Sequence, residues 1–362
     1  MIFLGIVIFG IFLVGTIAIQ DDSVAVVEVF RHGHRTPIVF YKTDPYADKS
    51  FWSGLDLGQL TNQGKREMYD LGQLTAQRYR QFLPQPYDKN NFYARCTDMD
   101  RTLMSGQCFL YGLFRSSSQQ VWLKDSDWQP VPLHPADPKV FLGFPFPCPA
   151  YDNYHANAFK TEAFQKLDKE NKDILEYVSK HTGDNYTTLF STWLLYDCLR
   201  VELEAGYKLP DWVPPVYEKL QDIIGLLYQT TTGTTQAKRL YTGTFLNYVV
   251  DYFEKMASNS SYSQKFQVFS GHDTDTNIAA ILNSFGAFDP PYPPAFASSI
   301  WIELKRNKGR YYVNVWSKDG SNLRQIKVNG CARNCPLHAF RKKLSDILLD
   351  PDTLTQECSD IS

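Results

Sequence analysis

The chain has 362 residues, and its 37 lysines and arginines nearly balance its 39 aspartates and glutamates, leaving a formal net charge of −2. This balance excludes the strongly basic surface of a nucleic-acid-binding protein, and an aromatic content of 15% excludes a largely disordered chain. The length predicts two domains, or one core with a large insertion.

The N-terminal segment 1–18 is almost wholly apolar, and two aspartates follow it closely. We interpret it as a secretory signal peptide that ends at Ala18. An N-terminal membrane anchor is the alternative, because no lysine or arginine precedes the run and its length approaches that of a membrane span. A strand that begins at Val24 leaves little room for a stalk, which favours the signal peptide. No second long apolar run exists, so we expect no stable membrane span in the mature chain.

An apolar strand over 24–30 ends in Arg31, His32, His34 and Arg35, grouped around one glycine. Such a strand is typical of a buried position in a sheet. Cationic side chains at its carboxyl end are costly unless an anion lies between them, and arginine binds phosphate in a bidentate manner. Because ligands of open α/β sheets bind at the carboxyl ends of strands, the segment predicts a phosphate pocket that contains a histidine.

The next elements alternate between helix and strand. Thr61 is the expected N-cap of a helix that runs to about Phe82, where prolines stop it. A short strand over 91–94 ends at Arg95, and a helical stretch follows over 98–114. Residues 126–150 are proline-rich and irregular.

The second half begins with mostly helical sequence over 151–257, interrupted by prolines and by a threonine run over 230–235. We expect that run to be an exposed loop without chemistry. A third strand, 266–270, ends in Gly271, His272 and Asp273. Two alternating strands, 300–304 and 311–315, predict a hairpin around Asn307-Lys308-Gly309.

These elements predict an α/β fold with a mainly parallel sheet flanked by helices, and a helical domain inserted between its halves. We place the α/β core at 19–125 and 262–362, and the mostly helical cap at 126–261.

Three predicted strands therefore end in residues that suit phosphate chemistry. Each ending is weak evidence alone, since a lone arginine is often a surface ion-pair partner and a His-Asp pair is often a helix cap. Together they are stronger, because parallel strands bring their carboxyl ends to one edge of the sheet. Phosphoryl transfer needs charge stabilisation, an in-line nucleophile and a proton for the leaving group.

The roles follow from the residue types. Arginines and His272 can bind the phosphate oxygens, and a neutral His32 can attack phosphorus to form a phosphoenzyme. The neighbouring arginines should lower the pKa of His32 and keep it nucleophilic in acid. Asp273 is the carboxylate among these strand ends, so it is the candidate general acid.

Two motifs identify a family. Residues 31–37 resemble the RHGxRxP signature of the histidine acid phosphatases, and residues 271–274 resemble the late His-Asp motif of that family. Segments 58–61, 95–105 and 128–134 resemble its prostatic and lysosomal branch. The resemblance extends over nearly all of the mature chain and implies an α/β core with a helical cap.

The resemblance also implies roles for residues at matching positions. His32 would be the nucleophile that becomes phosphohistidine, and Asp273 would donate the proton. The phosphate would be bound by Arg31, Arg35, Arg95 and His272. The family needs no metal or other cofactor. Position 34 is aspartate in the prostatic and lysosomal enzymes, and we expect His34 to line the mouth of the pocket without a catalytic role.

Seven cysteines in a probable secretory protein imply disulfides with at least one thiol left over. The spacing of Cys331 and Cys335 permits a metal site or a small-loop disulfide, and the lack of further ligands at suitable spacing favours the disulfide. The resemblance implies two bridges: Cys148–Cys358 and Cys331–Cys335.

A third bridge of that branch would join Cys198 to a position near 298–299, where this chain has serines. We therefore expect Cys198 to be a buried thiol, and Cys96 and Cys108 have no counterparts. Two sequons, at Asn185 and Asn259, predict N-glycosylation of an exported protein.

The sequence thus predicts a secreted or lysosomal acid phosphatase that acts on small phosphomonoesters or phosphoproteins. A phytase or a lysophosphatidate phosphatase of the same fold is the alternative substrate assignment. A homodimer is expected, since segment 128–134 resembles the dimer-contact region of the branch and contains an aromatic anchor.

Two other classes of protein remain as alternatives. A metal-dependent hydrolase is suggested by the His32-x-His34 pair, although flanking arginines would repel a dication. A non-catalytic secreted binding protein on the same fold would be expected to have lost His32 or Asp273, and both are present.

Overall fold

The computed structural model describes residues 22–83, 85–140, 147–259, 262–271 and 274–360. The predicted signal peptide, 1–18, lies outside the described residues, as do His272 and Asp273. Within the described ranges, no helix combines the length and the apolar character that crossing a membrane requires.

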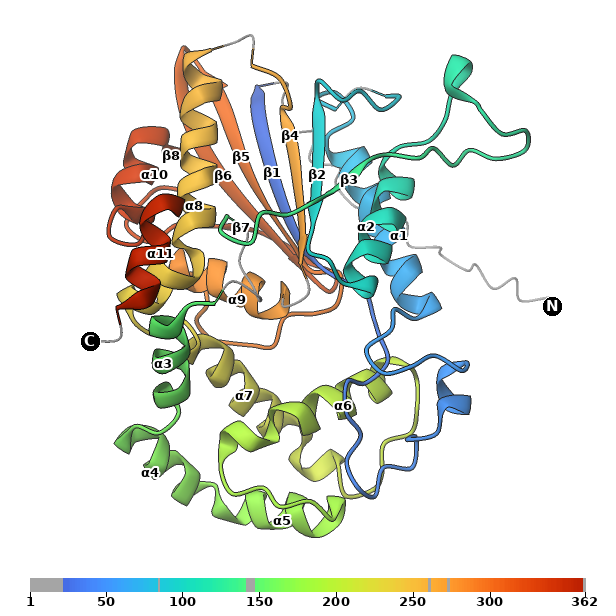
Figure 1. The fold of residues 1–362 in the computed structure, drawn as a ribbon, viewed down its shortest axis with the longest axis vertical. Coiled ribbons are helices and arrows are strands. Elements are labelled where there is room, and N and C mark those ends of the chain that lie inside the picture. Colours follow the sequence, from blue (N-terminus) through green and yellow to red (C-terminus); the bar gives the residue numbers. More distant parts are fainter. Residues whose placement is uncertain (1–21, 84, 141–146, 260–261, 272–273, 361–362) are drawn as a thin grey trace, which may run out of the picture.

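A mixed sheet forms the centre of the molecule, with the strand order β3-β2-β4-β1-β5-β6-β7 and β8 paired to β6 (Figure 1). The strands β1 to β4 pair in parallel, and the remaining pairs are antiparallel. The bounds are β1 Ser23–Arg31, β2 Phe92–Cys96, β3 Leu133–Pro135, β4 Phe266–Gly271, β5 Ser299–Asn307, β6 Arg310–Asp319, β7 Asn322–Ile326 and β8 Cys335–Pro336. The predicted α/β class is confirmed, with the parallel strands confined to one half of the sheet.

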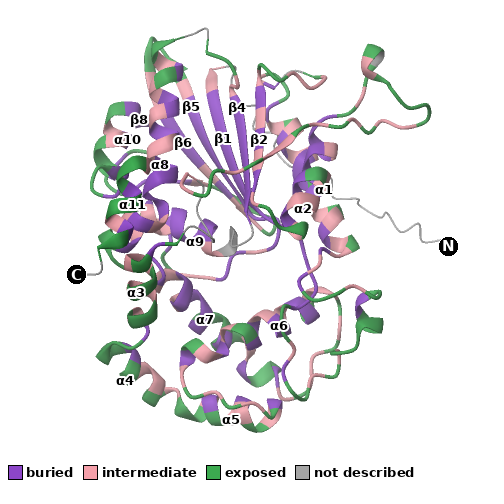
Figure 2. Cartoon of the chain, in the orientation of Figure 1, coloured by how far each residue is buried: buried purple, intermediate pink, exposed green. Residues whose placement is uncertain are grey.

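Helices cover both faces of this sheet. Their bounds are α1 Asn62–Arg78, α2 Asp100–Leu113, α3 Pro149–Ala158, α4 Glu162–Glu170, α5 Lys172–Thr182, α6 Trp193–Glu204, α7 Pro214–Thr230, α8 Thr235–Ser258, α9 Thr274–Ser284, α10 Leu337–Leu344 and α11 Pro351–Ser359. Short 3-10 turns lie at η1 Lys49–Trp52, η2 Ser118–Gln120 and η3 Leu189–Thr192. The central strands β1 and β4 are almost entirely buried, whereas the outer sides of the helices are exposed (Figure 2).

β1 packs against both helical layers because its side chains alternate between the two faces of the sheet. Val27 and Val29 belong to the apolar core shared with α8 and α9. Val26 and Phe30 belong to the core shared with α1 and α2. A strand buried on both faces reads as the continuous apolar run seen in the sequence.

The predicted start of α1 and the predicted hairpin are both confirmed. Thr61 caps α1, and its hydroxyl accepts a hydrogen bond from the Gly64 N–H at 3.1 Å. The hairpin joins β5 and β6 through Lys308 and Gly309, whose φ angles are +48° and +78°. Two consecutive left-handed residues are what a two-residue turn requires to match the twist of the strands.

The helices α3 to α7 lie beyond the carboxyl ends of the parallel strands, beside the loop that contains η1 (Figure 1). The structure places elements at both ends of the predicted cap, 126–261, with the sheet instead. β3 extends the sheet beside β2, and α8 packs along β1, α9 and α10. We use the word cap below for α3 to α7.

The threonine run between α7 and α8 differs from the exposed loop that we expected. Thr231 and Thr232 are buried, although the residues after them are exposed. The Asn283 side chain donates to the Thr232 carbonyl at 2.9 Å, and the Tyr154 hydroxyl donates to the Thr230 carbonyl at 2.7 Å. The run therefore connects the cap to the core.

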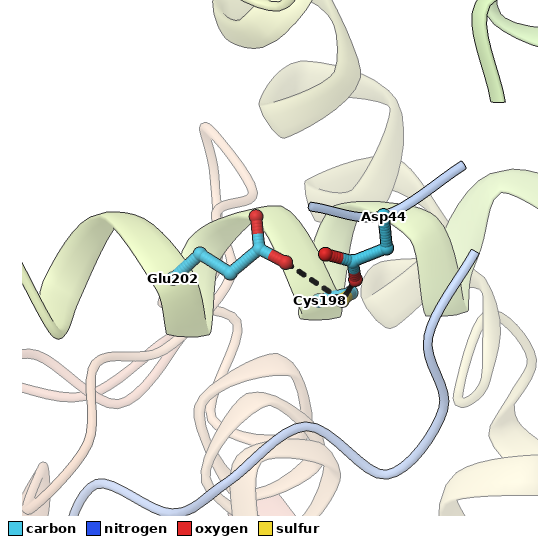
Figure 3. Close-up of side chains that lie close together, drawn as sticks. All are labelled: Asp44, Cys198 and Glu202. Atoms are coloured by element: carbon cyan, nitrogen blue, oxygen red, sulfur yellow. Dashed lines mark hydrogen bonds between the residues drawn. The ribbon is translucent and has the colours of Figure 1, made fainter. Parts of the chain in front are cut away.

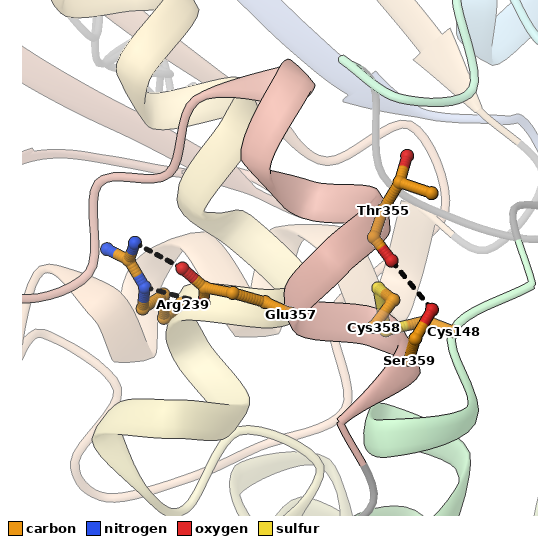
Figure 4. Close-up of a disulfide and its surroundings, with 6 residues drawn as sticks. All are labelled: Cys148, Arg239, Thr355, Glu357, Cys358 and Ser359. Atoms are coloured by element: carbon orange, nitrogen blue, oxygen red, sulfur yellow. Dashed lines mark hydrogen bonds and ion pairs between the residues drawn. A yellow bond between two sulfur atoms is a disulfide. The ribbon is translucent and has the colours of Figure 1, made fainter.

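Both expected disulfides are present, Cys148–Cys358 and Cys331–Cys335. The first joins the start of α3 to α11, next to the ion pair between Arg239 and Glu357 at 2.7 Å (Figure 4). Cys96, Cys108 and Cys198 are thiols, and Cys198 is buried as expected.

Candidate active site

The end of β1 places Arg31 and His32 in the interior, each about 1% exposed. Arg31 pairs in register with Gly271, the last residue of β4. The strands that carry the two predicted motifs, β1 and β4, therefore end at the same edge of the sheet.

Gly33 allows the chain to turn sharply after His32. A Cβ atom on this residue would collide with the backbone carbonyl of Gly64 in α1. The Gly33 N–H donates to the Ser105 hydroxyl of α2 at 3.2 Å, which ties the turn to the second helix. The motif therefore needs glycine here because two backbones approach each other closely.

The His32 ring is oriented by the backbone carbonyl of the next residue, Gly33. Its Nδ1 lies 2.8 Å from the Gly33 carbonyl oxygen, and a carbonyl only accepts hydrogen bonds, so Nδ1 is the donor. In the neutral ring, Nε2 then carries the lone pair. This is the tautomer that a histidine nucleophile needs.

Burial and charge together keep the His32 ring neutral. Burial lowers its pKa well below the ordinary value, and the positive charges of Arg31, Arg35 and Arg101 lower it further. The hydrogen bond to the Gly33 carbonyl opposes this shift. Both main causes penalise the imidazolium and therefore favour the neutral ring.

Arg101, and not Arg95, is the third arginine beside His32. Arg101 is in the first turn of α2 and lines one cavity together with His32 and Arg35. Arg95 is not among the described residues that line this cavity. It donates to the Gln267 side chain at 2.8 Å and to the Tyr248 hydroxyl at 3.0 Å, on the side of the sheet that faces α8.

The prediction of Arg95 assumed that a residue ending a strand points into the site. The buried residues of β2 alternate as Phe92, Ala94 and Cys96, and Phe92 and Ala94 pack in the core under α1 and α2. Arg95 therefore points to the other face. The tendency of anions to bind at helix N-termini was the signal that would have selected Arg101.

Arg35 is fixed by the cap. Its guanidinium forms a bidentate pair with Asp197 of α6, at 3.1 Å and 2.9 Å, and also donates to the Thr36 carbonyl. Both side chains are largely buried and both line the cavity. The plane of the Arg35 guanidinium is thus set by a residue of the cap.

His34 does not line the cavity mouth as we expected. It is buried, with Nδ1 2.9 Å from the Thr61 hydroxyl and Nε2 3.0 Å from the Val201 carbonyl of α6. The backbone N–H of His34 also donates to Glu67 at 2.7 Å. Both ring nitrogens are used in joining β1, α1 and α6, which argues against the alternative of a metal site at His32 and His34.

The cavity beyond His32, Arg35 and Arg101 has a volume of about 600 Å³. Its far wall is mainly aromatic and aliphatic, and the disulfide Cys148–Cys358 contributes to it. Its apolar residues include Ile38, Tyr151, Phe190, Trp193, Tyr228 and Leu354. Among the described lining residues, those charged beyond the two arginines are Lys139, Asp152 and Asp197. The cavity therefore suits a single phosphate attached to an apolar group.

A second polar cluster lies between the loop before η1 and α6 (Figure 3). Of the described residues, Asp44, Cys198 and Glu202 form the group whose side chains are close enough to share a metal. The Cys198 thiol donates to Asp44 at 3.3 Å and to Glu202 at 3.4 Å. Burial raises the pKa of Glu202 to about 9, and the negative charge of Asp44 adds to this shift. Protons shared among the thiol and the two carboxyl groups therefore allow these three side chains to lie close together.

Residues 24–317 match the family model of the histidine phosphatase superfamily, branch 2. The chain belongs to this family. Curated relatives include human prostatic acid phosphatase, which is 31% identical over 91% of this chain and 86% of the relative. Lysosomal acid phosphatase of Rattus norvegicus is 30% identical over 91% of this chain and 78% of the relative.

Solved structures of this histidine phosphatase fold are also similar. The apo form of Hafnia alvei phytase aligns with a TM-score of 0.68 at 16% identity, covering 93% of this chain and 98% of that one. The multiple inositol polyphosphate phosphatase of Bifidobacterium longum with phosphate aligns with a TM-score of 0.59 at 10% identity, covering 91% and 94%. At these identities the likeness concerns the fold alone.

Proposed function

We propose that this histidine phosphatase is an acid phosphatase that hydrolyses phosphate monoesters through a phosphohistidine at His32. The observation that carries the proposal is the neutral, buried His32 ring beside Arg31, Arg35 and Arg101. Three positive charges around a neutral nucleophile suit a phosphate dianion or monoanion and its transition state. The names of the curated acid phosphatase relatives support the same reaction.

The reaction proceeds in two steps. His32 Nε2 forms a bond to phosphorus while the bond from phosphorus to the ester oxygen breaks, and the leaving oxygen takes a proton. Water then attacks phosphorus while the bond from phosphorus to Nε2 breaks, and a proton of the water passes to the group that protonated the leaving oxygen. Inorganic phosphate leaves and His32 is regenerated. From the sequence motif we propose Asp273 as the donor of the first proton and His272 as a further phosphate ligand.

The direct test is the His32→Ala variant. We expect it to lose nearly all hydrolysis of p-nitrophenyl phosphate at pH 5 while keeping the melting temperature of the wild type within a few degrees. Brief mixing of the wild type with a labelled phosphomonoester should leave an acid-labile, base-stable label on the peptide that contains His32. Substantial turnover by His32→Ala, or a label on another residue, would contradict the proposal.

The cavity favours one substrate class within this reaction. An inositol polyphosphate needs several cations around its ring. Beyond Arg35 and Arg101, the described residues that line the cavity include one further lysine or arginine, Lys139. An aryl or long-chain alkyl phosphomonoester, such as a lysophosphatidate, can instead bury its leaving group on the aromatic wall. We expect kcat/KM for lysophosphatidate to exceed that for inositol hexakisphosphate, and a reversed order would contradict this preference.

We further propose that the protein enters the secretory pathway and works as a secreted or lysosomal enzyme. Two disulfides and the lysosomal and prostatic relatives support this location. Asn185 and Asn259 are both exposed, which is consistent with N-glycosylation at the predicted sequons. Release of glycan from peptides containing these residues by an amidase, after expression in a secretory host, tests the sites.

A homodimer is the proposed assembly, through the segment 115–128, which projects away from the sheet (Figure 1). Val121, Trp122, Leu123 and Trp128 are exposed there, and the two tryptophan rings pack together at 5.6 Å between centroids. Exposed aromatic and aliphatic groups of this kind are typical of interfaces. A second copy is the expected occupant because segment 128–134 resembles the dimer-contact region of the prostatic and lysosomal branch.

Light scattering tests this assembly. We expect a dimer mass for the wild type at micromolar concentration and a monomer mass for the double variant Trp122→Gln/Trp128→Gln. A monomer mass for the wild type, or an unchanged dimer of the variant, would count against this interface.

A further inference from the structure

Phe296 lies at the centre of the cationic residues of the site. Its side chain is buried, on the segment that precedes β5. The Cζ atom of Arg31 lies 4.1 Å from the centre of the ring, that of Arg200 5.6 Å and that of Arg35 5.9 Å. The rings of His32 and His34 lie 5.7 Å and 5.3 Å away, respectively.

The backbone around Phe296 is fastened to β1. The Arg31 N–H donates to the Ser298 carbonyl at 2.8 Å, and the Ala297 N–H donates to the His32 carbonyl at 3.1 Å. Ala297 takes a left-handed conformation with φ of +52°, which is unusual for a residue other than glycine. The fold thus maintains a strained backbone directly after Phe296, and strain of this kind concentrates at functional sites.

Two arginines also share one carbonyl next to this ring. The Pro294 carbonyl accepts hydrogen bonds from Nη1 of Arg31 and from Nη1 of Arg200 of α6, the latter at 2.9 Å. The ring of Phe296 then lies beside both guanidinium groups. The segment 294–298 therefore touches the phosphate arginines of the core and an arginine of the cap.

An aromatic ring can stabilise closely packed arginines at this site. Arginines packed around His32 repel one another when no phosphate is bound, and a buried cation needs compensation. A carboxylate beside each arginine would compensate the charge but would also weaken the attraction for phosphate. The face of an aromatic ring attracts a guanidinium through its quadrupole without bringing a full negative charge.

We propose that Phe296 is a positioning residue for phosphate binding, which orients Arg31 and Arg35 beside His32 through its π face. The proposal rests on the proposed phosphatase function, but phosphate binding can be measured without turnover. Asp197 of the cap compensates the charge of Arg35, whereas the π face of Phe296 in the core attracts the guanidinium of Arg31.

The first test compares three variants by phosphate binding and by kinetics. Phe296→Leu keeps an apolar side chain and removes the π face, and Phe296→Tyr keeps the π face. Phe288→Leu is the matched control, because Phe288 is a similarly buried aromatic residue between α9 and β5, and it packs on Tyr292. We measure the inhibition constant of inorganic phosphate at pH 5, and the rise in melting temperature that phosphate produces.

We expect Phe296→Leu to weaken phosphate binding about tenfold, and Phe296→Tyr to stay within about threefold of the wild type. Phe288→Leu should bind phosphate as the wild type does while melting at a lower temperature. Phosphate binding by Phe296→Leu equal to that of the wild type would overturn the proposal. If the wild type hydrolyses no phosphomonoester but binds phosphate in a Phe296-dependent manner, the proposed function fails and the positioning role stands.

A second series separates the π face from packing and remains informative if Phe296→Leu does not fold. Fluorinated phenylalanines with one, two, three and five fluorine atoms are introduced at position 296, since they progressively weaken the quadrupole with little change of shape. We expect the logarithm of the phosphate affinity to fall in proportion to the weakening of the quadrupole. An affinity that does not change through the pentafluoro ring would show that Phe296 acts by packing alone and would overturn the proposal.

Discussion

Burial and positive charge act in the same direction on His32, which makes its protonation unusual for a histidine. The pKa of the folded ring is lowered well below 6.5, whereas the ring of the unfolded chain titrates near that value. Below pH 6.5 the unfolded chain therefore binds a proton that the folded chain does not. His32 accordingly reduces the free energy of unfolding as the pH falls below 6.5.

Arg101 and Arg95, the two candidates for the third phosphate-binding arginine, are predicted to differ in their effect on kcat/KM. Arg101→Ala should lower kcat/KM for p-nitrophenyl phosphate by a factor of about 10² to 10³, because it removes one charge beside the transferred phosphoryl group. Arg95→Ala should change kcat/KM by less than about threefold, since Arg95 contacts Gln267 and Tyr248 on the α8 side. Steady-state kinetics at pH 5 compare the two variants, and a larger loss from Arg95→Ala would contradict the placement in the structure.

At the scale of single elements, β1 contains a second ionisable group, Glu28, whose pKa is changed by burial. Glu28 is fully buried, and its carboxylate oxygens accept hydrogen bonds from Thr75 of α1 at 3.1 Å and from Ser299 of β5 at 3.0 Å. Burial raises its pKa to about 8, although the hydrogen bonds lower it. A neutral acid is therefore part of the sheet core at acidic and neutral pH.

The sign of the Glu28 contribution follows from the direction of this shift. The folded chain binds a proton that the unfolded chain loses above about pH 4.5, so the contribution is complete below pH 4.5 and is lost as the pH rises to about 8. Glu28→Gln imitates the protonated form. We expect it to melt as the wild type does at pH 5 and at a higher temperature than the wild type at pH 8.

The exposed Glu176→Gln on α5 is the control for this measurement, because its side chain is 65% exposed and should not change the melting temperature at either pH beyond the usual small surface effect. Melting curves of the wild type, Glu28→Gln and Glu176→Gln at pH 5 and pH 8 test whether Glu28 is protonated in the folded protein. A Glu28→Gln protein that is less stable than the wild type at pH 8 would indicate that Glu28 is ionised in the fold.

At the scale of the whole molecule, the cap meets the core through α6, through the threonine run after α7 and through one disulfide. α6 provides Asp197 to Arg35 and the Val201 carbonyl to His34, so its position determines the geometry around His32. Cys148–Cys358 closes a loop of 210 residues that contains the whole cap, whereas Cys331–Cys335 spans 4 residues. A cross-link stabilises by restricting the unfolded chain, and this effect grows with loop length.

The two disulfides are therefore expected to differ in their effect on stability. Loop-closure entropy predicts a loss of about 5 kcal/mol in the free energy of unfolding for Cys148→Ala/Cys358→Ala, and of about 2 kcal/mol for Cys331→Ala/Cys335→Ala. Denaturant unfolding at pH 5 compares the two double variants with the wild type. Equal losses, or a larger loss from the short loop, would show that local packing around the sulfurs matters more than chain entropy.

Much of the fold follows from local sequence pattern. The apolar run of β1, the Thr61 cap of α1 and the turn at Lys308-Gly309 each depend on neighbours in the chain, and each is found where the pattern predicts it. The limits of the cap were harder to assign, because β3 lies in a proline-rich stretch and α8 in a helical one. β3 pairs with β2 and α8 packs on β1, so both depend on partners that are distant in sequence.

By itself, the sequence determined the α/β class and the histidine at the end of β1, because short motifs and strand ends encode them locally, and its resemblance to the histidine acid phosphatases implied the family and both disulfide pairs. Only the tertiary structure decided which arginine faces His32, since the pleat of β2 turns Arg95 away and the start of α2 brings Arg101 in. Only the structure placed His34 between α1 and α6, and Phe296 among the arginines. Contacts between residues hundreds of positions apart depend on the packing of helices on the sheet, and no local pattern specifies them.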